Sequence, residues 1–389
     1  MGFTQVTTER ARLPVRLRSV GVAPSHLGRF ELVRKLGAGG MATVWLARTL
    51  GAGGFERAVA LKRLHPRFAR DPRFVAMFLD EARLSACVHH ANVVSVEDIV
   101  THEGEFLLVM AYVPGRSVAE LLDAAAGQAM TPAVVVAVAV DLLAGLHAAH
   151  EAISLDGAPL SIIHRDVSPQ NVMVGRDGLA RVLDFGIASG AQTLAQDDRG
   201  RSGKPAYMAP EQLLGDALDR TVDLFSAAAV LWRMLTGTAP FAGTRSAERL
   251  ANMERGPARP RDRRDGEAES NALLDVLTRA LAYDRAARPP TAAAFARELR
   301  MACSPAAPEQ VSRWLDGLAP GPIAAPSRER LLGSQLEADT EVSPVPLQSY
   351  KRVRAEAWTE SGQLPPPSKP KPSQLRGGPW KHVKTLRHG

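Results

Sequence analysis

The chain has few cysteines: Cys87 and Cys303 are the two in 389 residues. Two cysteines cannot build the disulfide framework of a small secreted domain, nor a zinc site made of several cysteines. We therefore expect a cytoplasmic protein that works in a reducing compartment.

The chain also lacks an apolar run long enough to cross a membrane, which takes about 20 residues. Its longest run, Ala133–Val140, ends at Asp141, and we interpret it as part of a buried helix. The N-terminus has no apolar core of a signal peptide, and Val6 stands where a myristoylation motif needs Ser or Thr. We expect no membrane span.

Acidic residues are scarce at both ends of the chain. Residues 1–29 contain five Arg and one Glu, and residues 361–389 contain six Lys or Arg and no acidic residue. Since the whole chain has a net charge of +7, residues 30–360 carry a net charge of −3. A nucleic-acid-binding protein usually carries its positive charge on the folded body. We therefore expect no nucleic-acid partner, and the basic tail is a candidate for binding some other partner.

Composition divides the chain into three parts. Residues 1–29 mix Arg, Thr and Pro without periodicity, and we expect a flexible basic segment. Residues 30–302 are dense in apolar runs and form the expected folded domain. Residues 303–389 are Pro-rich and basic, and we expect disorder there. Within that tail, the amphipathic stretch Val311–Leu318 could dock on the domain as a helix.

Residue patterns predict an α+β domain with two lobes. Five strands are expected in the first part, at Phe30–Leu36, Thr43–Ala47, Ala58–Leu64, Val93–Ile99 and Phe106–Tyr112. Helices are expected at Phe74–Val88, Val118–Ala126, Pro132–Glu151, Asp219–Thr236, Asn271–Ala282 and Thr291–Cys303. A small β-rich lobe followed by a larger helical lobe predicts a ligand site in the cleft between them.

A glycine-rich string, LGAGGMATV, begins at Leu36 between the first two predicted strands. Glycines at positions 37, 39 and 40 would let backbone N–H groups approach a polyphosphate. Alone, the string fits a tight hairpin without a ligand equally well.

The string AVALKRL places Lys62 inside an apolar strand. A buried ammonium group is costly unless a carboxylate pairs with it, and Glu81 in the following helix is the expected partner. The alternative is a lysine near the sheet edge whose ammonium group reaches water.

Two further strings, HRDVSPQN from His164 and LDFGIA from Leu183, contain Asp166, Asn171 and Asp184. Two carboxylates and an amide supply the oxygen ligands that Mg²⁺ prefers. Singly, such residues are usually turn formers. Because three of them flank one predicted hairpin, downstream of Lys62, the sequence favours a metal-assisted site.

These strings together resemble the bacterial type of eukaryotic-like (Hanks-type) Ser/Thr protein kinases. Residues 30–301 contain GAGGMATV, VALK, HRDVSPQN, DFG (184–186) and APE (209–211) in that family's order. The resemblance implies a bilobal protein kinase fold. It also implies transfer of the γ-phosphoryl group of ATP to Ser or Thr hydroxyls of protein substrates, with autophosphorylation among the expected reactions.

The resemblance implies a role for each matching residue. Lys62 would hold the α- and β-phosphates and pair with Glu81, and Asp166 would orient the substrate hydroxyl and accept its proton. Asn171 and Asp184 would bind Mg²⁺, and Mn²⁺ would suit the same oxygen ligands.

Other positions match the family's nucleotide pocket and its structural anchors. The pocket residues implied are Gly37, Ala38, Gly39, Gly40, Val44, Ala60, Met110, Ala111 and Val113. Met110 would line the back of the adenine site, and the backbone of residues 111–113 would bond the base. Asp223 would tie down the catalytic loop, and Arg288 would pair with Glu211.

Three positions depart from the family pattern. Ala42 replaces a glycine, Ser168 replaces the lysine two residues after the catalytic Asp, and Lys204 replaces a threonine before the APE string. In the family fold the lysine and threonine side chains meet beside the catalytic Asp. We therefore hypothesise an exchange, in which Lys204 supplies the ammonium group missing at Ser168, and both act as catalytic residues.

The segment between DFG and APE suggests regulation. Arg165 is expected to bind an anion on this segment. The candidate phosphorylation sites are Ser189, Thr193 and Ser202, and the candidate built-in negative charges are Asp197 and Asp198.

Three alternatives stay open. A pseudokinase that binds nucleotide as a signalling scaffold would explain Ser168 and Lys204. A small-molecule phosphotransferase is disfavoured by the APE segment, and a tyrosine kinase by the pair Ser168–Pro169.

Overall fold

The computed structural model describes residues 26–51, 56–154, 156–185, 204–243, 245–259 and 268–318. Among the positions singled out above, Ser189, Thr193, Asp197, Asp198, Ser202 and Gly186 lie outside these residues.

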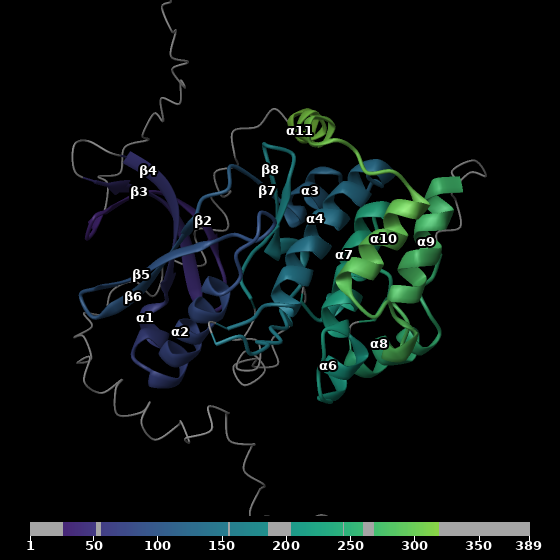
Figure 1. Cartoon of the computed structure of the whole chain (residues 1–389), viewed down its shortest axis with the longest axis horizontal. Coiled ribbons are helices and arrows are strands. Elements are labelled where there is room, and N and C mark those ends of the chain that lie inside the picture. Colours follow the sequence, from purple (N-terminus) through teal and green to yellow (C-terminus); the bar gives the residue numbers. More distant parts are fainter. Residues whose placement is uncertain are drawn as a thin grey trace, which may run out of the picture. The chain divides into compact units, whose positions relative to one another are not determined.

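The N-terminal lobe is a six-stranded antiparallel sheet in the order β1-β2-β3-β4-β6-β5, accompanied by helices α1 and α2 (Figure 1). Its strands are β1 (His26–Leu27), β2 (Phe30–Ala38), β3 (Ala42–Leu50), β4 (Glu56–Leu64), β5 (Val96–His102) and β6 (Glu105–Ala111). The helices are α1 (Pro66–Ala69) and α2 (Pro72–Ala86). All five predicted strands are present. Strand β5 begins at Val96 and not at Val93, and Val93 forms an isolated bridge with Val182 of the other lobe.

Strand β4 shows why this sheet forms. Its central residues are buried on both faces, and Val59 and Leu61 pack into an apolar cluster with Phe30 and Val109. Because side chains alternate along a strand, Ala60 and Lys62 point to the opposite face. The sheet therefore presents a lysine on the side away from that cluster.

Helix α2 begins two residues before the predicted start. Asp71 is its N-cap, and its carboxylate accepts a hydrogen bond from the backbone N–H of Arg73 at 2.9 Å. Pro72 occupies the first helical position, where its missing N–H costs nothing. The helix buries one face against the sheet, and that face includes Glu81.

The C-terminal lobe is mainly helical and contains a small sheet in the order β7-β8-β9 (Figure 1). The strands are β7 (Gly115–Ser117), β8 (Val172–Gly175) and β9 (Ala180–Val182). The helices are α3 (Val118–Ala124), α4 (Pro132–His150), α6 (Pro210–Leu214), α7 (Thr221–Thr236), α8 (Ser246–Glu254), α9 (Ala268–Ala280), α10 (Ala292–Ala302) and α11 (Pro308–Gly317). Three short 3-10 turns are η2 (Pro169–Asn171), η3 (Lys204–Tyr207) and η4 (Arg285–Ala287). The two-lobed α+β architecture is confirmed; α6 and α8 were not predicted.

Helix α4 alone, among the described residues, has the length and apolarity of a membrane span, with a mean hydropathy of 1.9. In this structure 61% of its most apolar stretch is buried. It packs in the core of the C-terminal lobe with α7 and α10. This packing agrees with the interpretation of Ala133–Val140 as part of a buried helix.

Helix α11 lies beyond residue 302, where we placed the end of the domain. Val311 and Leu315 are buried in the core of the C-terminal lobe, and Ser312 Oγ donates to the carbonyl of Arg176 at 2.8 Å. Gly178 has φ +77°, and a Cβ there would lie 1.9 Å from the carbonyl oxygen of Pro308. The packed body therefore continues to residue 318, because the apolar face of α11 is buried there.

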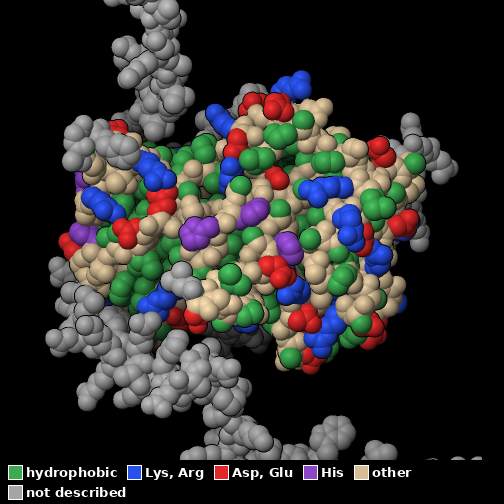
Figure 2. Space-filling view, in the orientation of Figure 1, with side chains coloured by type: hydrophobic (Ala, Val, Ile, Leu, Met, Phe, Trp, Pro, Cys, Tyr) green, Lys and Arg blue, Asp and Glu red, His purple; other side chains and the backbone are tan. Residues whose placement is uncertain are grey.

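On the face drawn in Figure 2, basic and acidic side chains are interspersed over both lobes. On this face, such mixing fits the small net charge of the central part of the chain.

Candidate active site

Lys62 on β4 and Glu81 on α2 form a buried ion pair. Nζ lies 2.5 Å from the Glu81 carboxylate, and the side chains are 11% and 8% exposed. Burial by itself lowers the pKa of Lys62, but the negative charges of Asp184 and Glu81 outweigh that effect and raise it. Lys62 is therefore a fixed positive charge, and the pairing predicted from the sequence is present.

Asp184 approaches the same ammonium group from the C-terminal lobe, at 3.1 Å from Lys62 Nζ. It has φ +45°, a backbone conformation that aspartate adopts only occasionally. The next residue, Phe185, is 1% exposed, and its ring centroid lies 5.1 Å from that of His164. Because Phe185 is anchored in this way, Asp184 stays turned toward Lys62.

Asp166 and Asn171 lie on the loop before β8 and are directly bonded. Asn171 Nδ2 donates to the backbone carbonyl of Asp166 at 2.8 Å and to its carboxylate at 3.0 Å. The backbone carbonyl of Asn171 accepts from Leu183 N–H at 2.9 Å, which joins this loop to the segment that carries Asp184. The three residues that the sequence assigned to metal-assisted chemistry are thus brought together.

The oxygen atoms of Asn171 and Asp184 suit a hard divalent cation. The described residues contain no group of three or more His, Cys, Asp or Glu that could hold a metal ion. Mg²⁺ typically binds one or two protein carboxylates and completes its shell with phosphate oxygens and water. The donor set therefore fits Mg²⁺ brought in with a nucleotide.

Asp223 of α7 fixes the catalytic loop through two hydrogen bonds and is itself held by a third from α4. Its carboxylate accepts from the backbone N–H groups of His164 and Arg165, both at 2.8 Å, as the resemblance implied. It also bonds His150 Nε2 at 2.8 Å, and both of these side chains are 1% exposed. Sequence analysis missed His150; its place on an apolar, buried helix was the available signal, because a buried ring nitrogen needs a partner.

Glu211 and Arg288 form a second buried ion pair, again as the resemblance implied. Two guanidinium nitrogens of Arg288 lie 2.7 and 3.0 Å from the two carboxylate oxygens of Glu211. The arginine side chain is fully buried, and that of Glu211 is 8% exposed. This bidentate pair ties α6 to the segment between η4 and α10.

Removing Arg288 should destabilise the protein strongly. Arg288→Ala leaves the Glu211 carboxylate buried without its partner, so we expect the free energy of unfolding to fall by about 3–5 kcal/mol. The matched control is Arg285→Ala, since that arginine pairs with Asp219 at the surface and should contribute no more than about 1 kcal/mol. Urea unfolding measures both. Equal losses for the two variants would contradict the prediction.

The strand register gathers other predicted pocket residues on one face of the sheet. Val44 is paired with Lys62, and Ala60 with Met110, which is buried. Ala111 ends β6 and donates its N–H to Ser95 at 3.0 Å; Val113 follows in the segment before β7. Val44, Ala60 and Met110 therefore lie on neighbouring strands on either side of β4 or within it, and Ala60 shares the face of β4 that carries Lys62.

The glycine-rich turn lies between β2 and β3, and Gly37, Ala38, Gly39 and Gly40 are all exposed. A Cβ added at Gly37 or Gly40 would meet nothing within 4 Å. Packing therefore does not explain Gly37 or Gly40, and neither has the positive φ that favours glycine; close approach of a ligand would account for them.

Ser168 is buried, with 1% exposure, and its Oγ has no hydrogen-bond partner in the part of the chain that the structure describes. Lys204 begins the turn η3, but its side chain lies outside the described residues. The proposed exchange between these two side chains stays a prediction, motivated by a buried hydroxyl that needs a partner.

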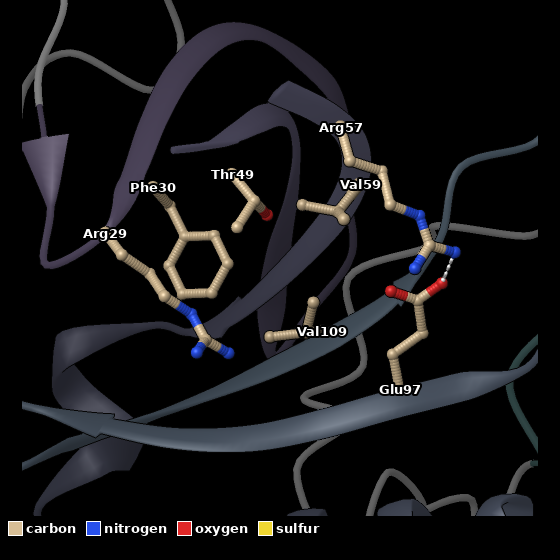
Figure 3. A pocket seen from close by; sticks show the side chains of 7 residues that line it. All are labelled: Arg29, Phe30, Thr49, Arg57, Val59, Glu97 and Val109. Atoms are coloured by element: carbon tan, nitrogen blue, oxygen red, sulfur yellow. Dashed lines mark hydrogen bonds and ion pairs between the residues drawn. The ribbon is translucent and has the colours of Figure 1, made fainter. Parts of the chain in front are cut away.

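Two cavities lie elsewhere. One of about 290 Å³ is formed by the apolar side of the N-terminal sheet, where Phe30, Val59 and Val109 meet Arg29 and the ion pair of Arg57 with Glu97 (Figure 3). Another, of about 470 Å³, lies among the residues after α2, those after β6 and the β8–β9 turn. The second is lined by Ala111 and Val113, which the resemblance assigns to the nucleotide pocket, but neither cavity is lined by Lys62, Asp166 or Asp184.

Several known proteins are similar to this chain. Residues 30–299 match the family described as protein kinase domain. The chain is 40% identical over 276 residues to the tyrosine-protein kinase MasK of Myxococcus xanthus, covering 70% of this chain and 42% of MasK. It is 35% identical over 293 residues to the serine/threonine-protein kinase PknB of Mycobacterium tuberculosis, covering 71% of this chain and 43% of PknB. The chain thus matches less than half the length of these relatives.

Solved structures agree with this match. The crystal structure of the Mycobacterium tuberculosis PknI kinase domain is 25% identical to this chain, with a TM-score of 0.54. The similarity covers 73% of this chain and 99% of that domain.

Proposed function

Because the chain belongs to the protein kinase domain family, we propose that it transfers the γ-phosphoryl group of ATP to Ser or Thr hydroxyls of protein substrates, its own chain included. The observation that carries this proposal is Lys62, which contacts Glu81 at 2.5 Å and Asp184 at 3.1 Å. This arrangement links the two lobes through one charged centre, with Asp166 and Asn171 already bonded to each other nearby.

The chemistry requires little covalent participation by the protein. The substrate hydroxyl oxygen forms a bond to the γ-phosphorus, the bond from that phosphorus to the β–γ bridging oxygen breaks, and ADP leaves. Asp166 orients the hydroxyl and accepts its proton. Lys62 stabilises negative charge on the α- and β-phosphates, and Glu81 holds the ammonium group in place.

Asn171 and Asp184 would hold Mg²⁺, and Mn²⁺ would fit the same oxygens. When bound, the cation neutralises charge on the β- and γ-phosphates. The hydrogen bond from Asn171 Nδ2 to the Asp166 carboxylate fixes the position of the proposed base relative to the amide that would bind the cation.

A second candidate is tyrosine phosphorylation, because the MasK relative, named as a tyrosine-protein kinase, is 40% identical to this chain. A third is a pseudokinase that binds nucleotide without turnover, for which Ser168 and Lys204 are the motivation. The scarcity of cysteine supports a cytoplasmic site of action, and the basic tail remains a candidate for partner binding.

One experiment separates these functions. Purified protein is incubated with Mg-ATP and a generic acceptor protein, and phosphorylated residues are mapped by mass spectrometry beside an Asp184→Asn control. We expect phosphoserine or phosphothreonine with the unmodified protein and none with the control. Phosphotyrosine alone would establish the second candidate. Binding of ATP without any phosphorylated residue would establish the pseudokinase.

A further inference from the structure

The linker segment between β4 and α2, residues 65–69, touches the glycine-rich turn at several points. The backbone N–H of His65 donates to the carbonyl of Met41 at 2.8 Å. The His65 ring bonds the strand that follows the turn, with Nε2 3.1 Å from Thr43 Oγ1 of β3. A residue that follows the lysine-bearing strand therefore holds the end of the turn through both backbone and side chain.

Arg67 makes the next contact, at the middle of the turn. Its Nη2 donates to the carbonyl of Gly40 at 3.2 Å. The guanidinium group also lies over the Phe68 ring, with its central carbon 4.7 Å from the ring centroid. That stacking restricts the arginine side chain, so less conformational entropy is lost in forming the hydrogen bond.

The linker segment continues this chain of contacts into α2. The rings of Phe68 and Phe74 are 4.5 Å apart between centroids, and Phe74 is in the first turn of α2. The same helix carries Glu81, the partner of Lys62. Consecutive contacts thus run from the glycine-rich turn, through the linker segment, to the helix that positions the lysine.

The sheet holds the two ends of the turn, since Gly37 pairs with Val44 and Ala38 with Thr43 in the β2–β3 ladder. Three glycines give it a large conformational freedom, and its tip is exposed. Within the turn, Gly39 N–H donates to the carbonyl of Ala42 at 2.8 Å. Additional contacts from outside the turn are therefore expected to reduce its motion.

The protonation state of His65 suits a hydrogen bond from an uncharged imidazole ring. Its pKa is lowered, first by partial burial and then by the positive charges of Arg67 and Lys35. The ring is thus uncharged near neutral pH and can bond the Thr43 hydroxyl without placing a third cation beside the turn.

We infer that the linker segment couples the glycine-rich turn to helix α2, with His65 and Arg67 as positioning residues. When the turn closes over nucleotide phosphates, the same contacts favour the position of α2 in which Glu81 holds Lys62. The role toward nucleotide rests on the proposed function, whereas the coupling itself is a property of the free protein.

The first test needs no nucleotide. Hydrogen–deuterium exchange is measured on the full chain for His65→Ala/Arg67→Ala. Arg70→Ala is the control, because it removes an exposed arginine directly after the linker segment. Losing two side-chain hydrogen bonds should speed exchange in residues 37–43 by about tenfold, while the control changes little. Exchange in the first turns of α2 should also rise. An unchanged turn, or an equal effect in the control, would overturn the inference.

The second test measures nucleotide binding by calorimetry with a non-hydrolysable Mg-ATP analogue. The double variant should raise the dissociation constant by about tenfold, with an unchanged Tm. The conservative pair His65→Gln/Arg67→Lys should restore most of the affinity, since both replacements keep a donor. In the Glu81→Gln background the effect of the double variant should shrink, because contacts that act as one unit are not additive. Full additivity would contradict coupling to α2.

Failure of the proposed function would look different. If the unmodified protein did not bind the analogue at all, the nucleotide site would be wrong, while the exchange measurement on the free protein would still decide whether the linker segment restrains the turn and α2.

Discussion

Replacing Asp184 by Asn is expected to lower phosphotransfer by about a thousandfold or more. The substitution removes the carboxylate that lies 3.1 Å from Lys62 Nζ and that would hold the divalent cation. An amide keeps the size of the side chain but not its charge. The initial rate of phosphate incorporation from Mg-ATP measures the effect.

The control for Asp184→Asn makes the same chemical change elsewhere. Asp275 is an exposed aspartate on α9 that pairs with Arg259 at the surface. Asp275→Asn should leave the rate within a factor of about two, since an exposed ion pair contributes little. A thermal unfolding curve for each variant shows that the fold is intact. If Asp184→Asn kept more than a tenth of the activity, Asp184 would not have the proposed role.

Replacing Lys204 by Thr is expected to lower phosphotransfer by about a hundredfold, because the transition state would lose a nearby positive charge. The hypothesis behind this expectation is that Lys204 and Ser168 have exchanged the lysine and hydroxyl of related enzymes. Burial of the Ser168 hydroxyl without a partner among the described residues is consistent with a missing neighbour of this kind.

The decisive variant combines Lys204→Thr with Ser168→Lys. If an ammonium group at either position is sufficient, the double variant should be at least about tenfold faster than Lys204→Thr. Ser168→Lys alone should not raise activity, because it places two ammonium groups together. A double variant as inactive as Lys204→Thr would contradict the exchange. Rates of the unmodified protein, the two single variants and the double variant together measure how far the two substitutions depart from additivity.

Most of the candidate active site could be predicted from the sequence. Lys62 stood out because a lysine inside an apolar strand needs a carboxylate, and Glu81 was found in the next helix. Asp166, Asn171 and Asp184 stood out because oxygen ligands recur within a short stretch of chain. Each of these patterns spans only a few residues, so it can be recognised in a single sequence.

Contacts between distant segments were harder to predict. His150 bonds Asp223, which lies 73 positions away in the chain. The sequence of neither helix indicates that these two side chains are partners. The predicted first residue of β5, Val93, instead forms an isolated bridge with Val182 of the other lobe, and β5 begins at Val96. Arg67 looks like any exposed arginine in the sequence, and its contact with Gly40 depends on how the linker segment turns after β4.

The sequence by itself determined the two-lobed α+β class, the order of the chemical motifs and the residues that carry charge in the site, because alternation, helical spacing and turn residues act over a few positions. The tertiary structure alone decided that His150 bonds Asp223 and that Arg67 bonds the carbonyl of Gly40 in the glycine-rich turn. It also buried α11 in the core of the C-terminal lobe, where the sequence had offered docking as one possibility. These outcomes depend on burial of apolar faces and on partners far apart in the chain, which no local pattern encodes.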